Sequence, residues 1–119
     1  MAKTCISCGI CAFYCPCCFC FFISDETTGD RGVRVRGWDS CSFPEYMLHA
    51  DGHNPRPDPP SRLRHRFLHK FVYLPEEVGS FGCTGCGRCA RLCPVGISIG
   101  QVMREFLTFR AGGELKRAG

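Results

Sequence analysis

Two stretches of the chain have hydrophobic residues at every third or fourth position, which is the spacing of one face of a helix. We expect one helix from Arg62 to about Tyr73 and another from Ser98 to about Arg110. The predicted inward-facing side chains are Leu63, Phe67, Phe71 and Leu74 in the first helix and Ile99, Val102, Met103, Phe106 and Leu107 in the second.

A third stretch has the pattern of β-strands. Phe21–Ile23 is a short apolar run, and Val33–Arg36 alternates apolar and basic residues, as half-exposed strands do. Residues 24–32 between them are polar and rich in turn-forming residues, so the pattern predicts a β-hairpin with a long loop. Because two strands alone are only marginally stable, we expect this hairpin to pack on the core of the protein.

Helix-capping patterns divide the rest of the chain. The Ser-x-x-Glu pattern at Ser42 predicts a short helix at 43–48, and the Ser-x-x-Gln pattern at Ser98 begins the last helix. A rigid, proline-rich linker precedes the first long helix, for which Asp58 or Ser61 is the expected cap.

The chemistry of the chain lies in its cysteines, of which there are twelve in 119 residues. Two runs share the pattern C-x2-C-x2-C-x3-C-P, one from Cys5 to Pro16 and one from Cys83 to Pro94. This is a bacterial ligand pattern for cubic iron–sulfur clusters. The first three cysteines of a run wrap one tight loop, whereas the fourth lies about one helical turn further on and points elsewhere.

Two complete runs predict two [4Fe-4S] clusters. In two-cluster ferredoxins the fourth cysteine of each run ligates the other cluster, so iron joins the two ends of the chain. We call the two expected ligand sets the first site and the second site. The first site consists of Cys5, Cys8, Cys11 and Cys93, and the second of Cys83, Cys86, Cys89 and Cys15.

Other uses of the cysteines fit less well. A disulfide framework is typical of secreted chains, but no secretory signal precedes Cys5. Structural zinc sites use isolated C-x2-C pairs rather than four-cysteine runs ending in proline. Four further cysteines are either small buried side chains or ligands of a third metal, although adjacent residues chelate one ion poorly. They are Cys17, Cys18, Cys20 and Cys41.

Length and composition favour a single α+β domain over residues 1–119. We expect a two-cluster, bacterial ferredoxin-like core with a long insertion, residues 16–82, between the cluster motifs, and a loose tail at 113–119. Fourteen glycines and eight prolines indicate much irregular backbone, for which metal binding can compensate. Free thiols at this density indicate a reducing compartment, so we expect a cytoplasmic protein with no membrane span.

The formal charge of +4 falls when the clusters are counted. Eight thiolates add about −8 and two oxidised cluster cores about +4, which brings the protein close to neutral. A basic patch on the first helix is interpreted as a solvated face, a docking surface for a partner subunit, or, less favoured, a nucleic-acid contact. It comprises Arg62, Arg64, His65, Arg66, His69 and Lys70. Trp38 is expected to be buried, as a shield for a cluster or as a core aromatic.

Several segments together resemble one family. They are Cys15-Pro16, Cys18-Phe19-Cys20-Phe21, Trp38-Asp39-Ser40-Cys41, Gly52-His53-Asn54-Pro55-Arg56-Pro57, Arg66-Phe67-Leu68-His69-Lys70-Phe71 and Phe81-Gly82-Cys83 with the run that follows. The chain is similar to the 4Fe-4S dicluster domain of the electron-transfer subunit of cytosolic nickel–iron hydrogenases (the sulfhydrogenase beta subunit) and of the corresponding component of anaerobic sulfite reductase. The resemblance implies the same eight cysteine ligands. Cys18, Cys20 and Cys41 also match family positions, whereas Cys17 stands where threonine is usual.

The resemblance also implies a function. The family's domain passes electrons between a hydrogenase or reductase subunit with the catalytic metal and a flavin-containing, nicotinamide-linked subunit. Family members usually carry a larger domain before the first run, so we expect a split subunit or a truncated relative. The chain alone should be a non-catalytic electron-transfer subunit, since no activated nucleophile, acid–base pair or nucleotide fingerprint is present. The alternatives are a stand-alone soluble ferredoxin and an iron–sulfur redox sensor that binds nucleic acid.

Overall fold

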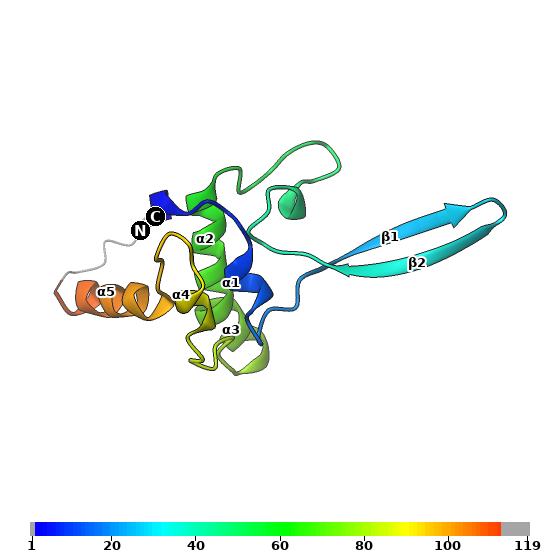
Figure 1. Cartoon of the computed structure of the whole chain (residues 1–119). Helices are drawn as coiled ribbons and strands as arrows, with labels where there is room; N and C mark the ends of the chain where they lie inside the picture. Colours follow the sequence, from blue (N-terminus) through cyan, green and yellow to red (C-terminus); the bar gives the residue numbers. More distant parts are fainter. Residues whose placement is uncertain (1, 113–119) are drawn as a thin grey trace.

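The computed structural model describes residues 2–112, with side chains described for residues 2–109, so the predicted loose tail lies outside the described residues. A two-stranded sheet and several helices make up the described chain, which confirms the α+β class (Figure 1). The elements are η1 (Ala2–Thr4), α1 (Ile10–Phe13), β1 (Phe21–Thr28), β2 (Arg31–Trp38), η2 (Glu45–Met47), α2 (Pro59–Leu68), η3 (His69–Tyr73), α3 (Leu74–Val78), α4 (Arg88–Arg91) and α5 (Ile99–Gly112).

One long helical run forms the centre of the body. α2 continues through the π-helical turn η3 into α3, so the run begins before and ends after the predicted helix. Asp58 caps it by accepting a 2.9 Å hydrogen bond from the Ser61 N–H, as predicted. Pro59 and Pro60 fit the first turn because their missing N–H groups would have no partner there. Gly79, with φ of 72°, ends the run.

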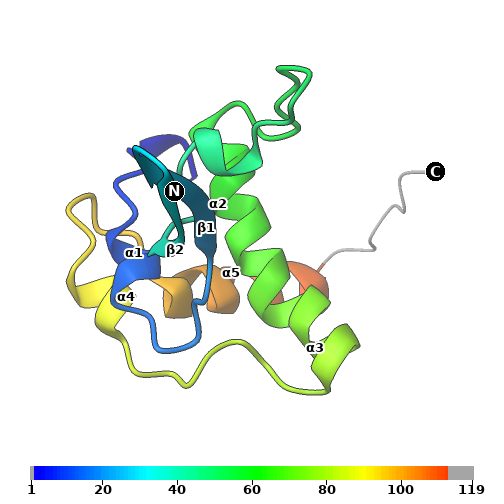
Figure 2. The same cartoon turned by 90° about the vertical axis from the view of Figure 1, so that its right-hand side faces the viewer.

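Two short helices from opposite ends of the chain lie side by side. α1 and α4 each follow the second cysteine of a run, and they contact one another next to α2 (Figure 2). α5 begins at Ile99 and contacts α4. Its predicted cap is present, since the Gln101 N–H donates to Ser98 Oγ at 3.4 Å.

The β-hairpin exists but differs from the prediction in two ways. Its strands pair in register from Phe21–Trp38 to Thr28–Arg31, so only Gly29 and Asp30 form the turn. Gly29, with φ of 64°, permits this tight turn. The hairpin also projects away from the body instead of packing on it (Figure 1). Both of its faces are exposed, so cross-strand pairing and not core packing defines it.

Two local predictions are wrong. The segment after Ser42 forms only the 3-10 turn η2, with no side-chain cap, because Ser42 is buried and its N–H donates to Ser40 Oγ at 3.1 Å. Trp38 is 42% exposed, although it packs edge-to-face against Phe13 of α1 with 5.1 Å between ring centroids. It therefore lies at the junction of hairpin and body, not in the core.

The hydrophobic core is small. Its buried apolar residues are Ala12, Cys41, Leu63, Leu74 and Ile97. The inward face predicted for the central helix is largely confirmed, since Leu63 and Leu74 are buried and Phe67 and Phe71 are half-buried. The stripe predicted for α5 is half wrong: Phe106 and Leu107 are 51% and 61% exposed, because no described element covers that end of the helix.

Candidate metal centre

The two cysteine runs fold in the same way locally. In each, a glycine after the second cysteine has a positive φ, 75° at Gly9 and 72° at Gly87, and directly precedes a one-turn helix. Only glycine adopts this left-handed backbone at little cost, and it turns the loop so that successive cysteines face a common centre. In the first run Ser7 has a positive φ as well, 54°.

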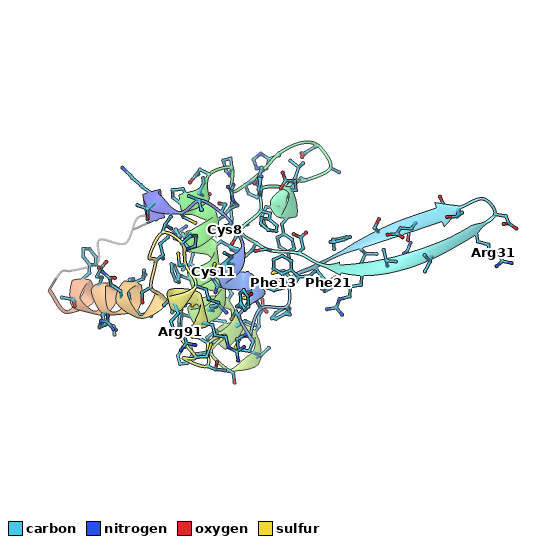
Figure 3. The ribbon with its side chains drawn as sticks, in the orientation of Figure 1. Cys8, Cys11, Phe13, Phe21, Arg31 and Arg91 are labelled. Carbon is cyan, nitrogen blue, oxygen red and sulfur yellow. The ribbon has the colours of Figure 1, made fainter. Side chains whose placement is uncertain are left out.

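Thiols from both ends of the chain meet at a first cavity. Cys5, Cys8 and Cys11 of the first run and Cys93 of the second line it, together with Cys89. Figure 3 shows Cys8 and Cys11 in the body, remote from Arg31 at the tip of the hairpin. The rest of the wall is mainly apolar: Ile6, Leu63, Phe67, Val95, Ile97 and Ile99. The cavity therefore contains all four thiols predicted for the first site.

A second cavity contains the other predicted set. Cys83, Cys86 and Cys89 line it with Cys15 from the first run. Arg66, Cys89 and Ile99 line both cavities, so the two share a wall. The second wall is more polar than the first and includes Lys70, Thr84, Gly85, Ser98 and Gly100.

The donor set of each cavity fits an iron–sulfur cluster. Four soft thiolates favour iron–sulfur clusters over hard cations. Among the described residues no three histidine, cysteine or acidic side chains lie close enough to hold a single ion, and the thiols instead surround a space. Backbone N–H groups point at two of the sulfurs: Ile97 donates to Cys93 Sγ at 3.2 Å and Gly85 to Cys83 Sγ at 3.5 Å.

Three cations of the predicted basic patch are buried, which is the main correction to the sequence analysis. Arg62, Arg66 and Lys70 are only 5%, 3% and 2% exposed. They recur at every fourth position, and each directly precedes a residue of the inward apolar stripe. That spacing is the signal that sequence reasoning missed. These three side chains are neither a solvated face nor a docking surface, whereas Arg64 is exposed.

Arg66 and Lys70 reach the cysteine runs. Arg66 donates from Nη1 to Cys18 Sγ at 3.1 Å and from Nη2 to the Cys11 carbonyl at 2.6 Å. Lys70 Nζ donates to Cys15 Sγ at 3.2 Å and to the Gly82 carbonyl at 2.6 Å. One helix face thus carries two positive charges to the wall between the cavities.

Arg62 has a different set of partners. Its guanidinium donates to the carbonyls of Ser42 at 3.0 Å and Pro57 at 2.7 Å, and to Ser7 Oγ at 3.2 Å. Ser7 stands between Cys5 and Cys8. Arg62 therefore ties the first cysteine loop to the linker before α2.

The pKa values of the thiols differ with their surroundings. The Cys18 thiol donates to Cys15, and with the charge and hydrogen bond of Lys70 this lowers the pKa of Cys15 to about 4. Burial raises the pKa of Cys11. The Arg88 N–H lowers the pKa of the exposed Cys86. Cys15 and Cys86 are thus favoured in the thiolate form that binds metal.

The remaining cysteines lie beside the body end of the hairpin. Cys18 contacts Cys15 and Arg66. Cys41 donates to Cys20, which lowers the pKa of Cys20 to about 5, and burial together with a hydrogen bond to Cys20 raises the pKa of Tyr46 to about 12. The Asp39 N–H donates to the Cys20 carbonyl at 3.1 Å. Cys41 is buried, as expected for a structural thiol, whereas Cys17, Cys18 and Cys20 are half-buried.

Comparison with known protein families agrees with this site. The model of the 4Fe-4S dicluster domain matches residues 4–97, which include both cysteine runs. The chain therefore belongs to the 4Fe-4S dicluster domain family. It carries two [4Fe-4S] clusters and is an electron-transfer protein of the ferredoxin type.

A curated relative makes the likeness more specific. The chain is 40% identical over 105 residues to the sulfhydrogenase 2 subunit beta of Pyrococcus furiosus, which confirms the resemblance to a hydrogenase beta subunit. The matched region is 87% of this chain but 31% of the relative, so the chain spans about a third of the length of that protein. No solved structure matches the chain.

Within the part of the chain that the structure describes, no helix is both long and apolar enough to cross a membrane.

Proposed function

We propose that this chain relays electrons through its two clusters as a non-catalytic subunit of an oxidoreductase complex in a reducing compartment, the cytoplasm. The observation that carries the proposal is the pair of thiol-lined cavities that share Arg66, Cys89 and Ile99. Two redox centres separated by one layer of side chains suit transfer from one to the other. The twelve free cysteines support a reducing compartment.

We further propose the crossed ligand sets, in which each run completes the other's cluster. The support is that Cys93 lines the cavity of the first run and Cys15 the cavity of the second. Cys89 lines both cavities, but its neighbours Cys83 and Cys86 line the second alone, so we assign it there. Residues 2–97 would then form one domain, because neither cluster is complete without both ends of the chain.

When bound, the clusters supply one-electron acceptor and donor sites. The residues of the chain have three tasks around them. The thiolates hold the iron, and the Ile97 and Gly85 N–H groups donate to ligand sulfurs. Buried Leu63 and Ile97 limit the access of water to the first site.

For partners, we propose a flavin-containing, nicotinamide-linked subunit on one side and a hydrogenase- or reductase-type catalytic subunit on the other. The similarity to a sulfhydrogenase beta subunit supports this. So does an exposed apolar groove between the central helix and α5, lined by Arg64, Phe67, Leu68, Phe71, Val72, Val102, Met103 and Phe106. Apolar surface of this kind is typical of chains that bind a protein partner.

Serine substitutions test the crossed ligand sets. Cys8→Ser and Cys86→Ser serve as references, since each removes a ligand of one site only. We expect Cys93→Ser to reproduce the electron paramagnetic resonance and Mössbauer spectra of Cys8→Ser, and Cys15→Ser those of Cys86→Ser, each with loss of roughly four iron atoms. If Cys93→Ser matched Cys86→Ser instead, the assignment would be uncrossed and this part of the proposal wrong.

Anaerobic purification from the native cell tests the partner role. We expect a stoichiometric complex that contains flavin and a metal-bearing catalytic chain, and in which reduced nicotinamide reduces the clusters of this chain. A free monomer that exchanges electrons with several enzymes would identify a stand-alone ferredoxin instead. Retention on DNA or RNA that falls steeply with salt would identify a nucleic-acid-binding sensor.

A further inference from the structure

We propose that Lys70 sets the two clusters apart, because its buried ammonium raises the reduction potential of the second-site cluster above the value that the cysteine motif alone would give. This inference rests on the proposed function, in which Cys15 ligates the second site. Lys70 is 2% exposed and lies in the π-helical turn η3. Its Nζ is 3.2 Å from Cys15 Sγ.

The burial of Lys70 requires a counter-charge. Removing an ammonium from water costs several kcal/mol unless an anion compensates it. Among the side chains of residues 2–109 the ion pair of the structure is Arg34–Asp25, on the hairpin, so no described carboxylate pairs with Lys70, Arg66 or Arg62. The groups that face Lys70 Nζ are the Cys15 sulfur and the Gly82 carbonyl. The anion that compensates it is therefore the thiolate-bound cluster.

The position of Lys70 is defined by the backbone around it. The Gly82 N–H donates to the Lys70 carbonyl at 2.8 Å while Lys70 Nζ donates back to the Gly82 carbonyl at 2.6 Å. Gly82 allows this approach, since a Cβ there would lie 3.2 Å from Lys70 Cα and 2.6 Å from Leu74 Cδ1. Gly82 directly precedes Cys83, so the same contact orients the second cysteine run. Turns of π-helix often occur at functional sites.

This charge distinguishes the two sites. Lys70 lines the second cavity and not the first, whereas Arg66 lines both. Reduction adds one negative charge to a cluster, and a nearby cation in a site of low dielectric constant stabilises the reduced form more than the oxidised form. An N–H···S bond to a ligand sulfur acts in the same direction. Removal of the ammonium should therefore lower the potential of the second-site cluster.

Four variants of the holoprotein separate charge from packing. Lys70→Met keeps the length of the side chain without charge or donor, Lys70→Gln keeps a donor without charge, and Lys70→Arg keeps both. Arg64→Gln is the matched control, because it removes a positive charge from an exposed position of the same helix. Midpoint potentials are measured by anaerobic redox titration followed by electron paramagnetic resonance, with the iron content of each sample determined.

We expect one of the two midpoint potentials to fall in Lys70→Met by at least tenfold in the equilibrium constant for reduction, which is about 59 mV for a one-electron couple. Lys70→Gln should fall less, and Lys70→Arg and Arg64→Gln should change little. Unchanged potentials in Lys70→Met with full iron content would overturn the inference. Loss of iron from Lys70→Met and Lys70→Gln but not Lys70→Arg would overturn it too, by assigning the charge to cluster retention.

The identity of the shifted cluster separates this inference from the ligand assignment. We expect the signal that moves to be the one that Cys86→Ser also alters. If it were the signal altered by Cys8→Ser, the charge would still act through Cys15, but Cys15 would belong to the first site and the crossed assignment would fail. If both signals moved equally, the selective effect of Lys70 on one site would be refuted.

Discussion

The two cysteine sites have the same local motif and different surroundings. Each run has the same spacing, a glycine with positive φ and a one-turn helix. The first site has an apolar wall that includes the buried residues Leu63 and Ile97, whereas the second has Lys70 and several small or polar residues. A motif therefore specifies which cofactor binds, and the elements packed against it specify the environment in which that cofactor works.

The central helical run causes much of this difference. It passes both sites, and its residues reach them in the order in which they occur along the helix. Leu63 lines the first cavity, Arg66 lines both, and Lys70 lines the second. Two turns of one helix thus change the wall from apolar to cationic. The environments of the two clusters are coupled to a single element, which is why substitutions along it are informative.

Iron removal should produce the largest effect. Because the core is small, we expect a chelator under anaerobic conditions to abolish the cooperative thermal transition seen by circular dichroism. The emission of Trp38, the single tryptophan, should shift to longer wavelength, because its partner Phe13 belongs to the helix of the first run. The shift should be larger in Cys8→Ser than in Cys86→Ser. Equal shifts would mean that the two sites do not unfold separately.

The matched glycines should give an intermediate and unequal effect. A Cβ at Gly9 would lie 2.7 Å from Phe43 Cζ, whereas at Gly87 it would meet nothing within 4 Å. Gly87→Ala should cost only the left-handed backbone strain, about 1–2 kcal/mol. Gly9→Ala should cost about 1–3 kcal/mol more from overpacking.

Thermal unfolding of the two holoproteins, each with its iron content confirmed, measures this difference. The midpoint of Gly9→Ala should be the lower of the two. A Gly87→Ala protein as unstable as Gly9→Ala would show that the second loop is packed as tightly as the first.

The hairpin should give the smallest effect and provides a reference outside both sites. Arg34 pairs with Asp25 at 2.7 Å and lowers the pKa of that carboxyl. A lowered folded-state pKa means that the pair stabilises the hairpin above the unfolded pKa and that the stabilisation is lost as pH falls through the folded value. Because both side chains are exposed, the contribution is small.

Asp25→Asn should therefore remove this slight pH dependence from the thermal midpoint of the holoprotein. Iron content and both midpoint potentials should stay as in the wild type. A change in either cluster would show that the hairpin contacts the metal sites more closely than its projection from the body indicates (Figure 1).

Prediction from the sequence succeeded where neighbours along the chain supply the cause. The Asp58 cap, the Ser98 cap and the hairpin each depend on a few adjacent residues. The lengths of the strands were underestimated, because a tight turn at Gly29 lets polar residues continue the pairing. The cap predicted at Ser42 failed because burial gave that residue a different partner.

The amino-acid sequence by itself determined the cofactor, because eight thiols at a fixed spacing bind iron–sulfur clusters whatever surrounds them. It also determined the family and the local form of each cysteine loop. Only the tertiary structure decided which cations face the thiols. Arg62, Arg66 and Lys70 have the composition of a surface patch, and they are buried because one helix lies between loops from opposite ends of the chain. A charged side chain is buried when an anion lies within its reach, and pairing over such sequence distances is a property of the fold.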